Sequence, residues 1–346
     1  MRPERGELYT RLEARIGNTP LIESHIKLPN GNRLFVKREC DNPFGSHYDR
    51  AYLLLFREYE EQGKIKPGDK VLETTSGSAG VSFAGIGKLL GFVCHVAIPA
   101  GGEKARERAI LEHLNSPDKL MFTPAELYVS GFPAFAKRYL AEHQDVVFLN
   151  HSMGKFNKKK GEVENNEVAL SAFEALGREI KSEVDADYAV LAFGNGSSIL
   201  GTIRGLSDKT RIIGFEHVQS GAAHEIKWPG KYEKEFGIKP GTLPRHKLPG
   251  TSYPGIEFPH ILNAIRSGRI EDIQLVSDKE TDLYYKQLTG KSTVSRLPHW
   301  DDIKLQDLDL GRSTKAAIAV TLKLAKKMKN KKIVIIAYDK PERYDN

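Results

Sequence analysis

Short apolar segments alternate along the chain with longer segments of helical periodicity. The apolar segments, each with the length and composition of a buried strand, are residues 34–37, 70–74, 92–98, 146–149, 188–193, 211–215 and 333–336. The helical segments between them include residues 81–90, 103–114, 168–184 and 313–328. Strands that alternate with helices form parallel sheets with helices on both faces, so we expect an α/β fold.

Length and composition exclude several classes of protein. The 346 residues give room for two domains. No apolar run approaches the roughly 20 residues of a membrane span, and the first residues contain no apolar signal region. The two cysteines, Cys40 and Cys94, are too few for a disulfide framework, which favours a reducing cytoplasm. We attribute the net charge of +7 to solvated lysines, and expect neither a nucleic-acid nor a membrane partner.

The stretch 42–50 carries the most specific local signal. It follows the apolar run 34–36 and contains a Pro/Gly turn, and a helical pattern begins at Ala51. Ser46 is placed to cap this helix. Tyr48 is therefore expected in the first turn, near backbone N–H groups that have no partner inside the helix.

This stretch resembles the cysteine synthase and cystathionine β-synthase family, which uses pyridoxal phosphate (PLP) on the fold type II scaffold. The family carries Asn-Pro-x-Gly-Ser-x-Lys-Asp-Arg here, and its lysine holds PLP as a Schiff base and moves the substrate α-proton. Tyr48 stands at the position of that lysine. Further family motifs follow in the same order, at residues 16–21, 75–79, 194–198, 246–250 and 338–344.

The resemblance implies two three-layer α/β domains of the tryptophan synthase β-like type, with the ligand cleft between them. It places the smaller domain at residues 41–150 and the larger one at residues 1–40 plus 151–346. It also implies a homodimer.

The glycine loop 194–198 ends a predicted strand and opens a helix. Backbone N–H groups at a helix N-terminus suit a phosphate, and in the family this loop holds the PLP phosphate. Its small and polar residues are Gly194, Asn195, Gly196, Ser197 and Ser198. Two other interpretations are a tight turn that binds nothing and a dinucleotide fingerprint completed by Glu216. The fingerprint matches poorly, because Ile199 stands where its third glycine should be.

The loop 75–79 resembles the Thr-Ser-Gly-Asn-Thr loop that grips the substrate carboxylate in the family. Thr75, Ser76 and Gly77 keep the hydroxyl and N–H donors for such a group. Ser78 replaces the asparagine that contacts the PLP ring hydroxyl, and Ala79 replaces the last threonine. A plain helix cap is the simpler interpretation and is compatible with anion binding.

A third loop, residues 311–317, aligns with the family sequence Gly-Ile-Ser-Ser-Gly-Ala-Ala. Ser313 would be the partner of the pyridine nitrogen. Lys315 replaces a glycine and would bring a cation to the substrate site, unless it is a solvated helix residue.

The replacement at Tyr48 decides the chemistry that we expect. A phenol cannot form an imine, and with a pKa of ~10 it is a reluctant base at neutral pH. His47 titrates near neutrality when unperturbed, although its side chain should point elsewhere on the first turn. Because Tyr48, Ser78, Ala79 and Lys315 all depart from the family pattern, the site looks repurposed or abandoned. Motifs for metalloproteases, serine hydrolases and P-loop enzymes are missing from the sequence, and we expect no metal site.

Three functions remain open. The first is a cysteine-synthase-like protein that binds a small anionic or amino-acid-like ligand, with PLP-independent chemistry or a sensor role. The second is PLP-dependent β-replacement or β-elimination on a serine derivative with another lysine, Lys155 or Lys315. The third is an interaction module whose loop 75–79 grips the C-terminus of a partner protein. In the first case PLP is not held as an aldimine at Tyr48, and the cleft takes PLP non-covalently, a phosphorylated ligand, or neither.

Overall fold

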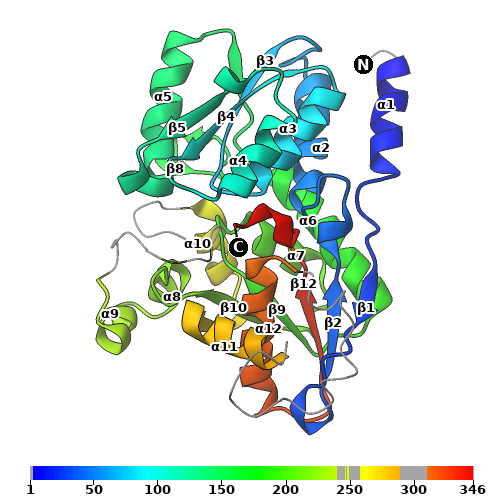
Figure 1. Ribbon diagram of the computed structural model, residues 1–346, viewed down its shortest axis with the longest axis vertical. Helices are drawn as coiled ribbons and strands as arrows, with labels where there is room; N and C mark the ends of the chain where they lie inside the picture. Colours follow the sequence, from blue (N-terminus) through cyan, green and yellow to red (C-terminus); the bar gives the residue numbers. More distant parts are fainter. Residues whose placement is uncertain (1–2, 240–245, 247, 249–257, 289–309, 346) are drawn as a thin grey trace.

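The computed structural model describes residues 3–239, 246, 248, 258–288 and 310–345, and these form two α/β units (Figure 1). The smaller unit contains a four-stranded parallel sheet in the order β5-β4-β3-β6. The larger unit contains a six-stranded sheet in the order β1-β2-β12-β9-β10-β11, parallel except for the β1–β2 pair. The predicted α/β fold with parallel sheets is confirmed.

The strands and helices have the following bounds. The strands are β1 Leu21–Glu23, β2 Arg33–Lys37, β3 Lys70–Thr74, β4 Val93–Pro99, β5 Leu120–Thr123, β6 Val146–Phe148, β7 Phe156–Asn157, β8 Glu162–Val163, β9 Tyr188–Ala192, β10 Arg211–His217, β11 Ile270–Val276 and β12 Lys332–Ile336. The α-helices are α1 Pro3–Glu13, α2 Tyr48–Glu61, α3 Ala79–Leu89, α4 Lys104–Leu111, α5 Phe132–Glu142, α6 Glu167–Glu183, α7 Ser197–Gly205, α8 Ala222–Lys227, α9 Lys231–Phe236, α10 Pro259–Arg266, α11 Asp278–Leu288 and α12 Arg312–Ala325. Short 3-10 turns include η2 Glu39–Asp41 and η7 Pro341–Arg343.

The central strand β12 shows why the strands of this chain read as continuous apolar runs. Ile333 and Ile335 belong to the core on the side of α12, whereas Val334 and Ile336 belong to the core that contains residues of α6 and α7. Alternate side chains point to opposite faces of a strand, and both faces of this sheet are covered. Apolar residues are therefore needed at successive positions.

The smaller unit has a core of its own, built on β3, β4, α2 and α3. Helix α1 adds Tyr9 and Leu12 to that core. The N-terminal helix therefore packs against the smaller unit, although the next strands in the chain, β1 and β2, belong to the larger sheet. All four strands of the smaller sheet lie between residues 70 and 148. The domain boundaries predicted at 41 and 150 stay predictions.

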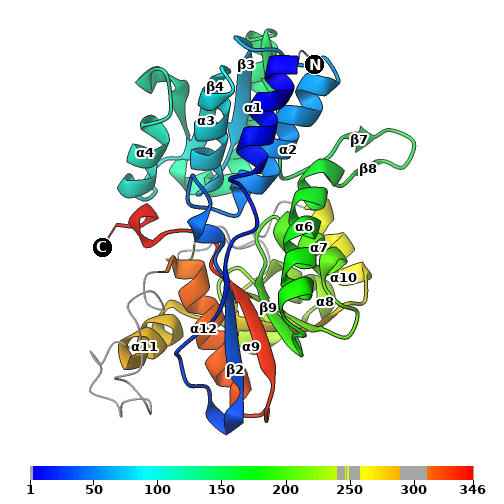
Figure 2. The same cartoon turned by 90° about the vertical axis from the view of Figure 1, so that its right-hand side faces the viewer.

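Several elements were not expected from the sequence. They include strand β5, helix α5, strand β11 and helices α10 and α11. The stretch 224–259, rich in Pro, Gly and Lys, begins with helices α8 and α9, on which His224 and Tyr232 are buried. Most of the rest of that stretch lies outside the described residues. The basic segment after Lys155 forms the β7–β8 hairpin, which projects from the molecule in Figure 2.

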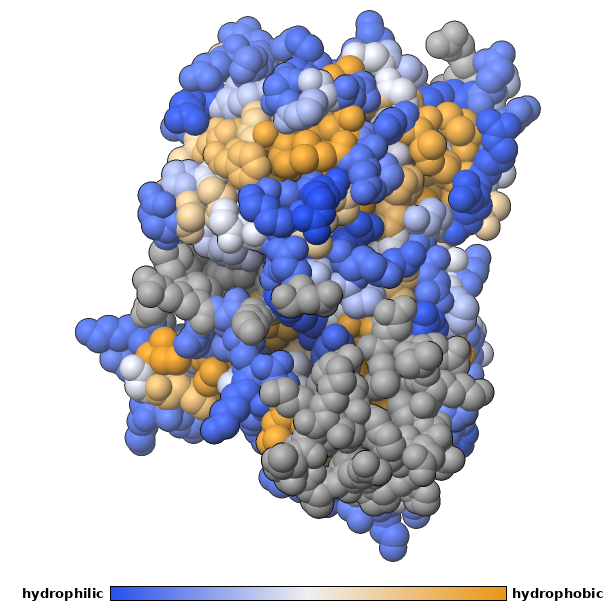
Figure 3. Space-filling view, viewed as in Figure 1, coloured by the Kyte–Doolittle hydropathy of each residue, from blue (hydrophilic) through white to orange (hydrophobic). Residues whose placement is uncertain are grey.

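The surface is mainly polar on the face seen in Figure 3, with the most extensive apolar area on the smaller unit. Phe122 and Leu127 of that unit are exposed by 50% and 43%, respectively. None of the helices in the described ranges is long and apolar enough to cross a membrane.

A buried ion network joins the two units beside the start of α2. Arg50 donates to both carboxylate oxygens of Glu39, at 2.7 and 2.8 Å, and to both of Glu179, each at 2.7 Å. The side chains of Arg50 and Glu39 are 6% and 0% exposed. Lys37 on β2 extends the network with ion pairs to Glu179 and Glu183 on α6.

We predict that Arg50→Gln lowers the free energy of unfolding by about 3 kcal/mol, because it leaves buried Glu39 without its counter-charge. Chemical denaturation followed by circular dichroism measures the change. The matched control is Arg57→Gln on the same helix. The Arg57 side chain is 39% exposed, so its ion pairs with Glu13 and Glu61 should contribute about 1 kcal/mol or less to stability. Equal losses in the two variants would contradict a structural role for the network.

Candidate functional site

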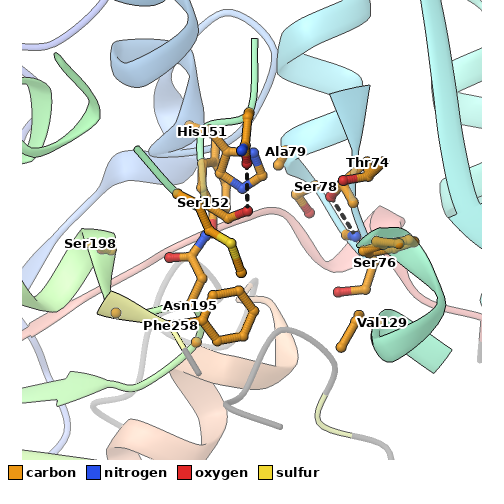
Figure 4. A pocket seen from close by; sticks show the side chains of 18 of the residues that line it. Thr74, Ser76, Ser78, Ala79, Val129, His151, Ser152, Asn195, Ser198 and Phe258 are labelled. Atoms are coloured by element: carbon orange, nitrogen blue, oxygen red, sulfur yellow. Dashed lines mark hydrogen bonds between the residues drawn. The ribbon is translucent and has the colours of Figure 1, made fainter. Parts of the chain in front are cut away.

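A cavity of about 360 Å³ lies between the two units (Figure 4). The smaller unit lines it with the start of α2 and the loop 75–79, and the larger unit with the glycine loop and Ser313. Figure 4 shows Ser76 and Ser78 on one side of the space and Asn195 and Ser198 on the other. The structure thus brings together most of the predicted site residues, namely His47, Tyr48, Thr75, Ser76, Gly77, Ser78, Ala79, Gly194, Asn195, Gly196, Ser198 and Ser313.

Tyr48 lies at the head of α2 and is partly buried among aromatic rings. The hydroxyl of Ser46 accepts a hydrogen bond from the Tyr48 N–H at 3.2 Å, in line with the predicted cap. The ring centroid of Tyr48 is 5.2 Å from that of His151 and 6.0 Å from that of Phe173, both in edge-on geometry. Burial, with the nearby carboxylates of Glu73 and Asp339, raises the pKa of the Tyr48 phenol above its ordinary value. The phenol is therefore a protonated donor at neutral pH rather than a base.

His47 corrects two expectations. Its side chain lines the cavity beside Tyr48, with the two ring centroids 4.2 Å apart, and does not point elsewhere. It is 6% exposed, and burial lowers its pKa to about 4, so it does not titrate near neutrality. The reason is that His47 precedes the helix proper, where its ring packs into the interior against Phe173 and Tyr338. His47 is neutral at pH 7 and is a poor candidate for the catalytic base.

The glycine loop opens helix α7, as a phosphate-binding loop would, but one of its backbone N–H groups is hydrogen-bonded within the loop. Gly196 has a φ of 88°, and a Cβ there would lie 2.4 Å from the backbone nitrogen of Ile261, so only glycine fits. The side-chain Oδ1 of Asn195 accepts from the backbone N–H and the hydroxyl of Ser197, at 2.9 and 2.7 Å. Ser197 is fully buried and is not among the residues that line the cavity, so its predicted contact with a cofactor stays a prediction. Of the backbone N–H groups of the loop, the contact with Asn195 takes that of Ser197, while Gly194, Asn195, Gly196 and Ser198 line the cavity.

The loop 75–79 presents donors at the start of α3. The Thr75 hydroxyl accepts from the Gly77 N–H at 3.0 Å, which fixes the turn. The side chain of Ser78 makes a contact with the larger unit. Its hydroxyl donates to Asp339 at 2.5 Å, and it is buried.

Lys315 is not brought to the cavity. It lies two positions after Ser313 on α12, and residues two apart on a helix do not share a face. The cavity therefore gives no support to its predicted contact with substrate, which stays a prediction. Lys155 is exposed before β7 and does not line the cavity either. Among the described residues, the one lysine that lines the cavity is Lys137 on α5, and it is exposed.

Three cavity residues were missed by the sequence analysis. Asp339 follows β12, is 7% exposed, and accepts hydrogen bonds from the Tyr344 hydroxyl at 3.0 and 2.9 Å. Burial raises the pKa of Asp339. Arg106 on α4 is 5% exposed and lies over the Tyr344 ring, 5.1 Å from its centroid. The family ending at residues 338–344 pointed to this segment, but no role was assigned to Asp339 or Tyr344.

A second buried cluster supports the floor of the cavity below Tyr48. Glu73 accepts hydrogen bonds from the backbone N–H groups of Thr74 and His151, at 2.8 and 3.1 Å. Nδ1 of His151 lies 2.9 Å from the hydroxyl oxygen of Tyr52, within hydrogen-bond distance. Within the described ranges no group of three His, Cys, Asp or Glu side chains is arranged to hold a metal ion.

Comparisons with known proteins agree with this geometry. A family profile described as pyridoxal-phosphate dependent enzyme matches residues 12–339. Cysteine synthase B of Pseudomonas aeruginosa is 24% identical over 344 residues, which cover 97% of this chain and 96% of the relative. Cysteine synthase B of Salmonella typhimurium is 28% identical over 228 residues, which cover 64% of this chain and 70% of that relative. The structure of the O-acetylserine dependent cystathionine β-synthase of Helicobacter pylori has a TM-score of 0.74 and 22% identity, covering 96% of both chains.

We predict that Tyr48 keeps its proton when ordinary tyrosines ionise. Because its folded-state pKa lies above the 10.0 of an exposed tyrosine, its contribution to stability is present below about pH 10 and is lost as the pH rises further. Spectrophotometric titration should therefore show the same number of tyrosinates near pH 10 in the wild type and in Tyr48→Phe. One tyrosinate fewer in the variant would show that the phenol is accessible to solvent and ionises normally.

Proposed function

The chain belongs to the family of pyridoxal-phosphate dependent enzymes, and within this family we propose that it is a cysteine-synthase-like protein whose cleft binds a small ligand without a Schiff base at Tyr48. The ligand class is anionic or amino-acid-like. The cleft serves PLP-independent chemistry or ligand sensing.

The observation that carries this proposal is the phenol at the head of α2. The resemblance to the family puts the anchoring lysine at this position, and Tyr48 lines the cavity there. A phenol has no nitrogen with which to form an imine, and its raised pKa removes it as a proton acceptor at neutral pH. The alternative of a recruited lysine loses its support, because neither Lys155 nor Lys315 lines the cavity.

PLP is the cofactor that the family implies, and the residues of this cleft fit it only in part. The start of α7 and Ser313 face the cavity and suit a phosphate and a ring nitrogen. However, the side-chain oxygen of Asn195 accepts hydrogen bonds from the N–H and the hydroxyl of Ser197. The hydroxyl of Ser78 donates a hydrogen bond to Asp339. No described lysine lies in the interior of the cavity. The set does not fit a covalently anchored PLP.

We also propose that the chain forms a homodimer, and as a further alternative that loop 75–79 binds the C-terminus of a partner protein. Light scattering of the purified protein gives the oligomeric state directly.

We expect no sulfide-dependent formation of cysteine from O-acetyl-L-serine by the purified protein, with or without added PLP, because the amine required for the chemistry is missing at Tyr48. A colorimetric cysteine assay with a working cysteine synthase as reference measures the turnover. Robust cysteine formation would overturn the proposed function.

We also predict that Tyr48→Lys regains the visible absorption of a PLP Schiff base but little turnover. Losing one well-placed donor costs on the order of a hundredfold in rate, and the family donors at Ser78 and Ala79 are both missing. Activity should rise further only when Ser78→Asn and Ala79→Thr are added to Tyr48→Lys. Family-level activity in the single variant would show that Tyr48 is the only defect of the site.

A further inference from the structure

The imidazole of His151 has one engaged ring nitrogen and one free ring nitrogen. His151 lines the cavity, and Figure 4 shows it at the border of the space that Ser78 and Asn195 also border. Its Nδ1 lies 3.2 Å from Oε2 of the buried Glu73 and 2.9 Å from the hydroxyl oxygen of Tyr52. Within the described part of the chain its Nε2 has no hydrogen-bond partner, and this atom is not sealed from the cavity.

The carboxylate of Glu73 fixes which nitrogen of His151 carries the proton. An ionised carboxylate can only accept hydrogen bonds, whereas a hydroxyl can donate or accept. The contact with Glu73 is therefore favourable when the proton of the neutral imidazole is on Nδ1, and this leaves a lone pair on Nε2. Glu73 is itself held by the backbone N–H groups of Thr74 and His151. Its charge would stabilise the imidazolium that forms when Nε2 takes a proton.

A hydroxyl donor lies beside this acceptor. The ring centroids of Tyr48 and His151 are 5.2 Å apart, and both side chains line the cavity. Among the described residues the Tyr48 hydroxyl has no hydrogen-bond partner, and the raised pKa of the phenol keeps it protonated at neutral pH. The cavity thus contains a base and an acid on neighbouring side chains, neither of which is used by the fold.

We infer that His151 and Tyr48 form an acid–base pair that enolises a small 2-oxo acid, with Nε2 of His151 as the base and the Tyr48 hydroxyl as the donor to the carbonyl oxygen. This inference rests on the proposed function and names the PLP-independent chemistry of its cleft. Glu73 acts through His151 and is a positioning residue.

The step needs no reactant beyond the ligand and the chain. The C–H bond on the carbon beside the carbonyl group breaks, and its proton goes to Nε2 of His151. The electron pair of that bond forms the C=C bond of an enolate, and the negative charge passes to the former carbonyl oxygen. The Tyr48 hydroxyl stabilises this charge by a hydrogen bond. The proton, or a proton taken from solvent by Nε2, then returns to the carbon.

The class of ligand follows from what such a pair can do. A neutral imidazole is too weak a base for an ordinary C–H bond, so the bond must lie beside a carbonyl group, whose oxygen then needs the Tyr48 donor. An anionic ligand agrees with the proposed function, since the helix starts of α3 and α7 face the cavity. A free amino acid that forms no imine lacks the activating carbonyl group and should not react.

Exchange of ligand protons with solvent tests the inference on the unchanged full-length chain. Proton NMR in D2O follows the C3 protons of pyruvate and of 2-oxobutanoate, with the α-proton of L-alanine as the control that lacks a carbonyl group beside it. We expect exchange of at least one 2-oxo acid above the rate in buffer, and none of L-alanine. His151→Gln should lower the enzymatic rate about a hundredfold or more, and Tyr48→Phe about tenfold or more.

The matched control is His143→Gln, which changes an exposed histidine after α5 and should leave the exchange rate unchanged. If neither 2-oxo acid exchanges, or if His151→Gln exchanges as fast as the unchanged chain, the inference is overturned. Either result leaves the proposed function standing, because that function is tested separately by the formation of cysteine.

Two further measurements test the role of Glu73. Nitrogen-15 NMR of histidine-labelled protein, with His151 assigned by its loss in His151→Gln, should show the proton of the neutral ring on Nδ1. A proton on Nε2 would contradict the inference without any ligand. Glu73→Gln keeps an oxygen that accepts from the backbone N–H groups but removes the charge. It should lower the exchange rate about tenfold or more while the affinity for the exchanging 2-oxo acid, from calorimetry, stays unchanged. Loss of affinity by the same factor as the rate would contradict the positioning role.

Discussion

The guanidinium of Arg50, held between Glu39 and Glu179, is the interaction on which the geometry of the cleft depends. Arg50 lies in the first turn of α2, two residues after Tyr48, and Glu179 comes from α6. Paired, bidentate hydrogen bonds fix direction as well as distance. The network therefore sets how the head of α2 enters the cleft, and with it the position of the Tyr48 ring between His151 and Phe173.

The cleft that results combines aromatic and ionisable side chains. The rings of Tyr48, His47 and His151 lie close together, and Arg106 and Asp339 line the same cavity. In the proposed function, the two loops at the helix starts suit anions, and Tyr48 stands between them where the family resemblance places an amine. This combination favours binding over covalent catalysis.

Much of the fold follows from local sequence, because strands such as β12 are covered on both faces and must be apolar throughout. The loops that open α3 and α7 could also be located, since glycine and hydroxyl residues mark them. The contacts that define the site could not. Asp339 meets Ser78, and Arg106 meets Tyr344, only after strands far apart in sequence have paired. The orientations of His47, Ser197 and Lys315 depend on where each helix begins, and sequence patterns place helix ends least reliably.

The central claim is that the cleft holds its ligand without a covalent bond to the chain. The most direct measurement is the mass of the purified protein, prepared without added PLP, under native and denaturing conditions after treatment with borohydride. The account predicts that any small molecule seen in the native spectrum is lost on denaturation, leaving the mass of the unmodified chain. A pyridoxyl group that remains attached to a lysine, located by peptide mapping, would contradict it.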